Sequence, residues 1–127
     1  MNKKTVIFDL DGTLANIDVR RDKSMKPNGK LDWEIFADPD SILNWDTPNE
    51  PVVKMAQMFD NEGFNIVIFS GRNDRGWGAT VEWLENNKIW WDLLVMRPDK
   101  FKPKSWPISN GNPATPDMRF MPDEILK

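Results

Sequence analysis

Two aspartates one residue apart, Asp9 and Asp11, carry the clearest chemical signal in this chain. They follow the apolar run Thr5–Phe8 and precede Gly12, which permits a tight turn. Close like charges raise the pKa of one carboxyl or recruit a cation, and nothing nearby in the sequence neutralises this pair. A carboxyl with a raised pKa can donate a proton while its ionised neighbour attacks. The alternative is an Asp-Gly turn with an incidental second aspartate.

A second polar turn, Ser70-Gly71-Arg72, follows the apolar run Phe64–Phe69. A serine hydroxyl and the next backbone N–H can bind phosphate at a strand end, and an arginine can add a bidentate contact. By itself this tripeptide is more typical of an ordinary turn. Because parallel strands end at one edge of a sheet, its pairing with the two aspartates indicates a phosphate site there.

The elements that must position these turns alternate between buried strands and amphipathic helices. Strands are expected at 5–8, 64–69 and 90–95, and helices at about 49–62 and 80–87. This order favours an α/β fold, a three-layer Rossmann-like parallel sheet with flanking helices. Asn49 is the expected N-cap of the first of these helices, and Gly63 marks its end.

Two segments lack such patterns within the single domain expected over 1–127. Residues 15–48 are interpreted as a flap or cap-like insertion. Its polar part, 15–30, is expected to be a loop. A short helix is expected at 31–36, and Asp38-Pro39-Asp40 ends or redirects it. The basic residues of this loop either meet an anionic substrate or are merely solvated. Residues 100–121 are a proline-rich loop with interleaved lysines and aromatics, which either grips single-stranded nucleic acid or is simply exposed.

Composition limits the chemistry. The chain has 127 residues, a net charge of −3, no cysteine and no histidine, so thiol nucleophiles are excluded and proton transfer falls to carboxylates or lysine. A nucleic-acid substrate would need a local basic patch. No apolar stretch is long enough for a signal peptide or membrane span, which favours a cytoplasmic protein with no membrane partner.

The segment from Asp9 to Thr13 resembles the first signature of the haloacid dehalogenase (HAD) superfamily, and 70–127 is similar to the 3′-phosphatase domain of phage polynucleotide kinase and to phage-type HAD phosphatases. The resemblance implies a Mg²⁺-dependent phosphomonoesterase that works through an aspartyl-phosphate. Asp9 would attack phosphorus, and Asp11 would protonate the leaving oxygen and then activate water. Asp9 and the backbone carbonyl of Asp11 would be the metal ligands.

The same resemblance implies a phosphate-binding set and a class of substrate. The phosphate-binding residues would be Thr13, Ser70, Gly71, Arg72 and Lys127. Arg97 and Arg119 are further candidates for substrate contact. The implied substrate is a nucleic-acid or nucleotide 3′-phosphate, with a small phosphomonoester as the alternative.

The chain departs from the family pattern after Lys127, where HAD enzymes continue into a strand that ends in the last metal-binding acid. We therefore expect a minimal-cap, C-terminally abbreviated HAD-type fold. A second hypothesis follows, in which the protein is a non-catalytic or incomplete subunit that binds phosphate or a partner. It would then act as a homo-oligomer or with a completing chain.

Overall fold

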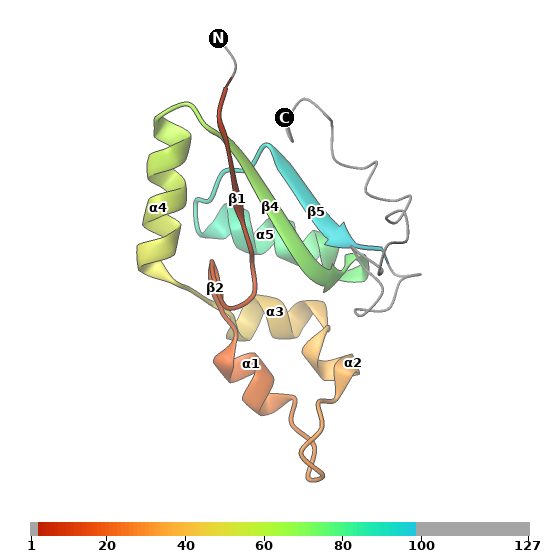
Figure 1. Cartoon of the computed structure of the whole chain (residues 1–127). Helices are drawn as coiled ribbons and strands as arrows, with labels where there is room; N and C mark the ends of the chain where they lie inside the picture. The colour runs from red at the N-terminus through yellow and green to blue at the C-terminus, as the bar shows by residue number, and fades with distance from the viewer. Residues whose placement is uncertain (1–2, 99–127) are drawn as a thin grey trace.

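A parallel three-stranded sheet lies at the centre of residues 3–98, the part of the chain that the computed structural model describes (Figure 1). Its strands are β1 (Thr5–Phe8), β4 (Asn65–Asn73) and β5 (Leu93–Arg97), in the order β1-β4-β5. Both strand pairs are parallel. Helices flank the sheet, so the expected α/β architecture is confirmed.

The strand bounds differ from the expected ones at two places. Strand β4 runs on past Phe69 to Asn73, so the Ser-Gly-Arg tripeptide lies within the strand. Strand β5 begins only at Leu93, because the backbone and side chain of Asp92 first bind the backbone of Ile66. Trp90 and Trp91 therefore precede the strand that they were expected to begin.

The hydrophobic core joins alternate side chains of the sheet to helices α4 (Glu50–Asn61) and α5 (Trp77–Asn86). Phe8 of β1 pairs in register with Ile68 of β4, and both are buried. Full burial of such a side chain stabilises the fold by about 1.5–3 kcal/mol. The other main members of the core are Ile66, Leu94 and Met96 from the strands and Val53, Ala56, Trp83 and Leu84 from the helices.

Helix α4 begins and ends where the sequence predicted. Asn49 occupies the N-cap position, Pro51 lies in the first turn, and Gly63 follows the helix with φ +86°. The side chain of Asn49 does not cap the helix, because its amide donates to the backbone C=O of Thr13 at 2.9 Å. This bond fastens the start of α4 to the turn that carries the aspartates.

The insertion is helical. It contains α1 (Asp18–Lys23), α2 (Trp33–Phe36) and α3 (Pro39–Trp45), and is closed at its base by β2 (Ala15–Asn16) paired with β3 (Thr47–Pro48). Figure 1 shows these helices beyond the carboxyl ends of β4 and β5.

Two expectations for the insertion were wrong. Residues 15–30 are not a plain loop, because α1 forms without an apolar face: its one buried side chain is Arg20. The Asp38-Pro39-Asp40 segment begins a helix, since Asp38 accepts a hydrogen bond from the N–H of Asp40 and the proline occupies the first turn. Within 3–98, no helix is long and apolar enough to cross a membrane.

Candidate active site

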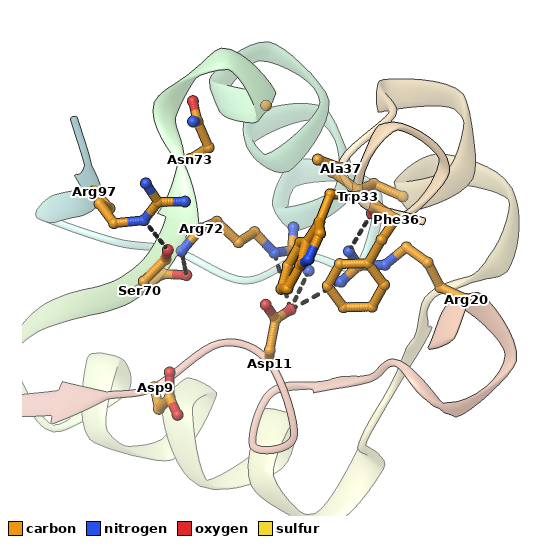
Figure 2. Close-up of a pocket in the computed structure, with 13 residues that line it drawn as sticks. Asp9, Asp11, Arg20, Trp33, Phe36, Ala37, Ser70, Arg72, Asn73 and Arg97 are labelled. Carbon is orange, nitrogen blue, oxygen red and sulfur yellow. Dashed lines mark hydrogen bonds and ion pairs between the residues drawn. The ribbon is translucent and has the colours of Figure 1, made fainter. Parts of the chain in front are cut away.

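A cavity of about 320 Å³ opens between the carboxyl edge of the sheet and the insertion (Figure 2). We call it the site cavity. Its sheet side is lined by Asp9, Asp11, Ser70, Gly71, Arg72 and Arg97, and its insertion side by Arg20, Trp33, Phe36, Ala37 and Ile42. The structure therefore brings together the two polar turns that were read from the sequence.

Asp9 is the exposed residue that follows β1, and its carboxylate lines the site cavity. The N–H of Leu10 donates to its Oδ1 at 2.7 Å. The turn beyond it is closed by the N–H of Ala15, which donates to the C=O of Leu10 at 2.9 Å, and Gly12 adopts φ +80° within that turn. A tight turn at a strand end thus presents an accessible carboxylate to the cavity.

Asp11 is held by two arginines that are distant in the sequence. Its Oδ1 accepts hydrogen bonds from Arg72 Nη2 at 2.6 Å, Arg72 Nε at 2.9 Å and Arg20 Nη2 at 3.0 Å. No hydrogen bond from the described residues reaches Oδ2. The expectation that nothing neutralises the aspartates was wrong for Asp11, because its cationic partners come from the insertion and from β4.

Asp46 binds the same two arginines from the opposite side. Arg20 Nε donates to its Oδ1 and Arg72 Nη2 to its Oδ2, both at 2.8 Å, and the side chain of Asp46 is 0% exposed. Its backbone C=O accepts a bond from Trp83 Nε1 at 3.0 Å. Burial raises the pKa of Asp46, while its hydrogen bond from Arg20 and the charges of both guanidiniums act in the opposite direction.

Asp11, Arg20, Asp46 and Arg72 form what we call the arginine–aspartate cluster. Its two guanidiniums and two carboxylates balance in formal charge. A buried, balanced cluster adds little net stability, yet removing one member leaves an uncompensated charge that costs about 3–5 kcal/mol. The cluster therefore fixes the position of Asp11 more than it stabilises the fold.

Each guanidinium also donates a hydrogen bond outside the cluster. Arg20 Nη1 donates to the C=O of Phe36 at 2.7 Å, and its guanidinium carbon lies 4.3 Å from the centre of the Phe36 ring. Arg72 Nη1 donates to Thr80 Oγ1 at 3.0 Å. The two arginines thus anchor α2 and α5 to the cluster as well.

The expected phosphate-binding residues are placed in different ways. Ser70 is buried, and its Oγ accepts the backbone N–H of Arg72 at 3.0 Å. The pairing of β4 with β5 shifts register between Ser70 and Asn73, and such a bulge re-aims side chains beside active sites. The guanidinium of Arg72 is directed to the cluster, and the Nε of Arg97 donates to the C=O of Gly71 at 3.0 Å.

Three other candidates lie away from this cavity or beyond the described part of the chain. Thr13 does not line the site cavity, and its backbone C=O accepts the Asn49 amide. Arg119 and Lys127, together with the proline-rich segment 100–121, lie outside the described residues.

Metal binding can be judged from the oxygen atoms that the site offers. Within 3–98, no three His, Cys, Asp or Glu side chains converge as a metal site. The carboxylate of Asp9 lines the cavity, and no hydrogen bond from the described residues reaches the backbone C=O of Asp11. Mg²⁺ commonly takes one or two carboxylates and completes its shell with waters and substrate phosphates. The donor set fits such an ion.

Sequence reasoning missed the structural roles of Arg20 and Asp46. Arg20 was noted only among the basic residues of a loop, and Asp46 only as part of a turn. They lie 26 residues apart, and no local pattern links them. The signal that can reveal such a pair is covariation between the two positions in related sequences.

Comparison with known proteins places this site in context. The family model of the polynucleotide kinase PNKP phosphatase domain matches residues 3–108. A chain of a solved Pnkp1/Rnl/Hen1 complex is 28% identical with a TM-score of 0.59, over 81% of this chain and 31% of that one. A chain of a Pnkp1/Rnl/Hen1 RNA repair complex is 30% identical with a TM-score of 0.60, over 81% and 29%. This chain thus spans less than a third of those proteins. Among curated proteins, none matches.

Proposed function

Because this chain belongs to the family of polynucleotide kinase PNKP phosphatase domains, we propose that it hydrolyses phosphomonoesters through Asp9. The observation that carries the proposal is the contrast between the two aspartates of the site cavity. Asp9 is exposed at the end of β1, whereas Asp11 is fixed through one oxygen by two guanidiniums. One carboxylate is thus accessible for attack, and the other is held in place for proton transfer.

In the first step, a carboxylate oxygen of Asp9 attacks phosphorus, and the bond from phosphorus to the leaving oxygen breaks. The protonated carboxyl of Asp11 gives its proton to that oxygen, which departs as an alcohol. Oδ2 of Asp11 suits this transfer, because the described residues direct their three hydrogen bonds to Oδ1.

In the second step, the carboxylate of Asp11 takes a proton from water as the water oxygen attacks the phosphorus of the aspartyl-phosphate. The bond between phosphorus and Asp9 breaks, which releases inorganic phosphate and restores both carboxyls. Ser70 and the backbone N–H of Gly71 are the proposed phosphate donors.

Charge balance supports a role for Mg²⁺. With Asp11 ionised the arginine–aspartate cluster is formally neutral, and with Asp11 protonated for the first step it carries a single positive charge. In both states Asp9 and a dianionic phosphate bring more negative charge than the cluster offsets. Asp9 and the backbone C=O of Asp11 would hold the ion, which would neutralise part of the phosphoryl charge. Arg97, which lines the cavity, is a further proposed contact for the phosphate.

We propose a nucleic-acid or nucleotide 3′-phosphate as the substrate. Support comes from the family model and from the solved relatives, one of which belongs to an RNA repair complex. Those relatives were solved in complexes with other proteins, so a partner chain is part of the proposal. Activity on a polynucleotide should fall steeply with salt, whereas activity on a mononucleotide should not.

The test is hydrolysis of an aryl phosphate with and without Mg²⁺, beside Asp9→Asn. We expect metal-dependent turnover that falls at least about 1,000-fold in Asp9→Asn, since the nucleophile is lost. Asp22→Asn, which alters an exposed aspartate of α1, is the matched control and should stay near the wild-type rate.

Near-wild-type activity of Asp9→Asn would contradict the mechanism. Absence of turnover in the folded wild-type chain would favour the second hypothesis, a phosphate-binding subunit that requires a completing chain. Circular dichroism and thermal melting establish that each variant is folded.

A further inference from the structure

The site cavity continues outward into a second depression of about 320 Å³. We call this depression the outer groove. It is lined by Trp33, Ala37, Asn73, Arg75 and Arg97, and all of these except Arg75 also line the site cavity. A molecule that places a phosphate near Asp9 therefore has a continuous path along Trp33 to Arg75.

Trp33 presents an open aromatic surface at the junction of the two cavities. It is 61% exposed, although it begins a helix of the insertion. The Trp33 ring meets that of Phe36 edge to face at 5.5 Å and 86°, and Phe36 in turn packs on the guanidinium of Arg20. Trp33 lines the same cavity as Asp11 and the two arginines (Figure 2). The ring is thus supported by Phe36, while most of the Trp33 side chain remains accessible to a ligand.

The charges around Trp33 differ on its two sides. The charged side chains that line the outer groove are both cationic, Arg75 and Arg97. A neighbouring depression that also includes Trp33 and Arg75 contains the carboxylates Glu34 and Asp38. An anionic chain is therefore favoured along the arginine side of the ring and disfavoured along the other.

We propose that the outer groove binds the terminal nucleotides of a single-stranded nucleic acid, with an unpaired base stacked on Trp33 and the adjoining phosphodiester near Arg75. An aromatic face beside cationic side chains is the combination that binds single strands. A base inside a duplex is stacked on both faces, and a terminal base pair leaves only its outer face open, whereas an unpaired terminal base can turn to meet the ring. This inference rests on the proposed function, because it assumes that the terminal phosphate occupies the site cavity.

The test compares two 3′-phosphorylated tetranucleotides that differ only in the terminal base, which is present in one and absent in the other. We expect Trp33→Ala to lower kcat/KM for the complete substrate about 10- to 100-fold. The kcat/KM for the abasic substrate should change about twofold or less. Trp33→Phe should restore most of the loss. Trp90→Ala is the matched control, because Trp90 is 58% exposed and lines a different depression.

An equal loss on both substrates would overturn the inference, because it would mean that Trp33 acts through the packing of Phe36 and Arg20. An unchanged rate on the complete substrate would also overturn it. Arg75→Gln should reduce the slope of log affinity against log salt by about 0.7, the value for one phosphate of a single strand.

Binding separates this inference from the proposed function. We would titrate a labelled tetranucleotide 3′-phosphate into Asp9→Asn protein, with and without Trp33→Ala, and follow fluorescence anisotropy. If the protein binds the complete strand more tightly than the abasic strand, and Trp33→Ala abolishes this preference, nucleotide binding in the outer groove is supported. This holds even if the wild-type chain shows no hydrolysis. Equal affinity for the complete and abasic strands, or tighter binding of a duplex, overturns the groove even where the phosphatase is active.

Discussion

The carboxyl edge of the sheet and the helical insertion face each other across the site cavity, but they position their side chains by different means. At the sheet edge, Asp9 and Ser70 sit where the hydrogen-bonded strands β1 and β4 bring them. Strand β4 is largely buried, whereas β1 is a sheet-edge strand whose expected burial is contradicted at Ile7, which is 55% exposed. In the insertion, Arg20 lies on the six-residue helix α1, and it is the only buried residue of that helix. The first side is held by apolar packing, whereas the second combines ion pairs to the first with the packing of Ile42 of α3 in the core.

This difference decides how each side responds to substitution. The backbone at the sheet edge keeps its place when a side chain there loses its polar partner, because the core beneath it is intact. The short helices of the insertion are marginal by themselves, and they depend on contacts with the rest of the molecule. A change in the ion pairs should therefore disturb the insertion more widely than the sheet.

Within the arginine–aspartate cluster, the largest effect is expected from Arg72→Lys, on the sheet side. Arg72 gives two hydrogen bonds to Asp11 and one to Asp46, and a lysine cannot reproduce that fork. We expect kcat to fall about 100-fold, because Asp11 would lose its fixed position. Steady-state hydrolysis of an aryl phosphate measures this, and a loss below threefold would contradict a positioning role for Arg72.

A smaller effect on turnover is expected from Arg20→Lys, on the insertion side, since Arg20 gives Asp11 a single bond. We expect kcat to fall about 10-fold, and the free energy of unfolding to drop by about 3 kcal/mol because buried ion pairs are broken. Urea unfolding measures the second quantity.

Arg21→Lys is the matched control for Arg20→Lys, because its ion pair with Asp18 is exposed. It should change the free energy of unfolding by less than about 0.5 kcal/mol. Equal destabilisation by the two variants would show that the insertion is not held by the cluster.

The smallest effect is a pH dependence of stability that arises from Asp46. Burial raises its pKa above the ordinary value, so this carboxyl binds its proton more tightly in the folded chain than in the unfolded one. Its titration therefore favours folding below the unfolded-state pKa, and this contribution is lost as the pH rises through the folded-state pKa. As the pH is lowered through that window, the unfolding free energy of the wild type should therefore rise relative to that of Asp46→Asn. A shift in the opposite direction in urea titrations would contradict the raised pKa.

The sequence predicted the sheet side of the site better than the insertion side, for a physical reason. Strands leave a run of apolar residues, so the strands that lead to Asp9 and Ser70 could be inferred locally. The turn expected at Ser70 was wrong, because β4 continues to Asn73. Helix α1 leaves no such trace, because its buried position is occupied by a charge. The partners of that charge come from distant parts of the chain, such as Asp46, 26 residues away.

Trp33 illustrates the same limit in another way. Its spacing with Phe36 indicated a short helix, and α2 confirms it. The pattern could not show that the ring would remain exposed beside a cavity, because exposure depends on where the whole insertion is placed.

The arginine–aspartate cluster has a further consequence for the dynamics of the protein. It joins the turn after β1, helix α1, the C-cap of α3 and strand β4, which are four separate stretches of the chain. Local opening of any one of them breaks at least one contact to Asp11 or Asp46. Partially opened forms therefore lack an assembled site. Amide hydrogens around the cluster should exchange as one cooperative group, and catalytic activity should report the population of the intact native state.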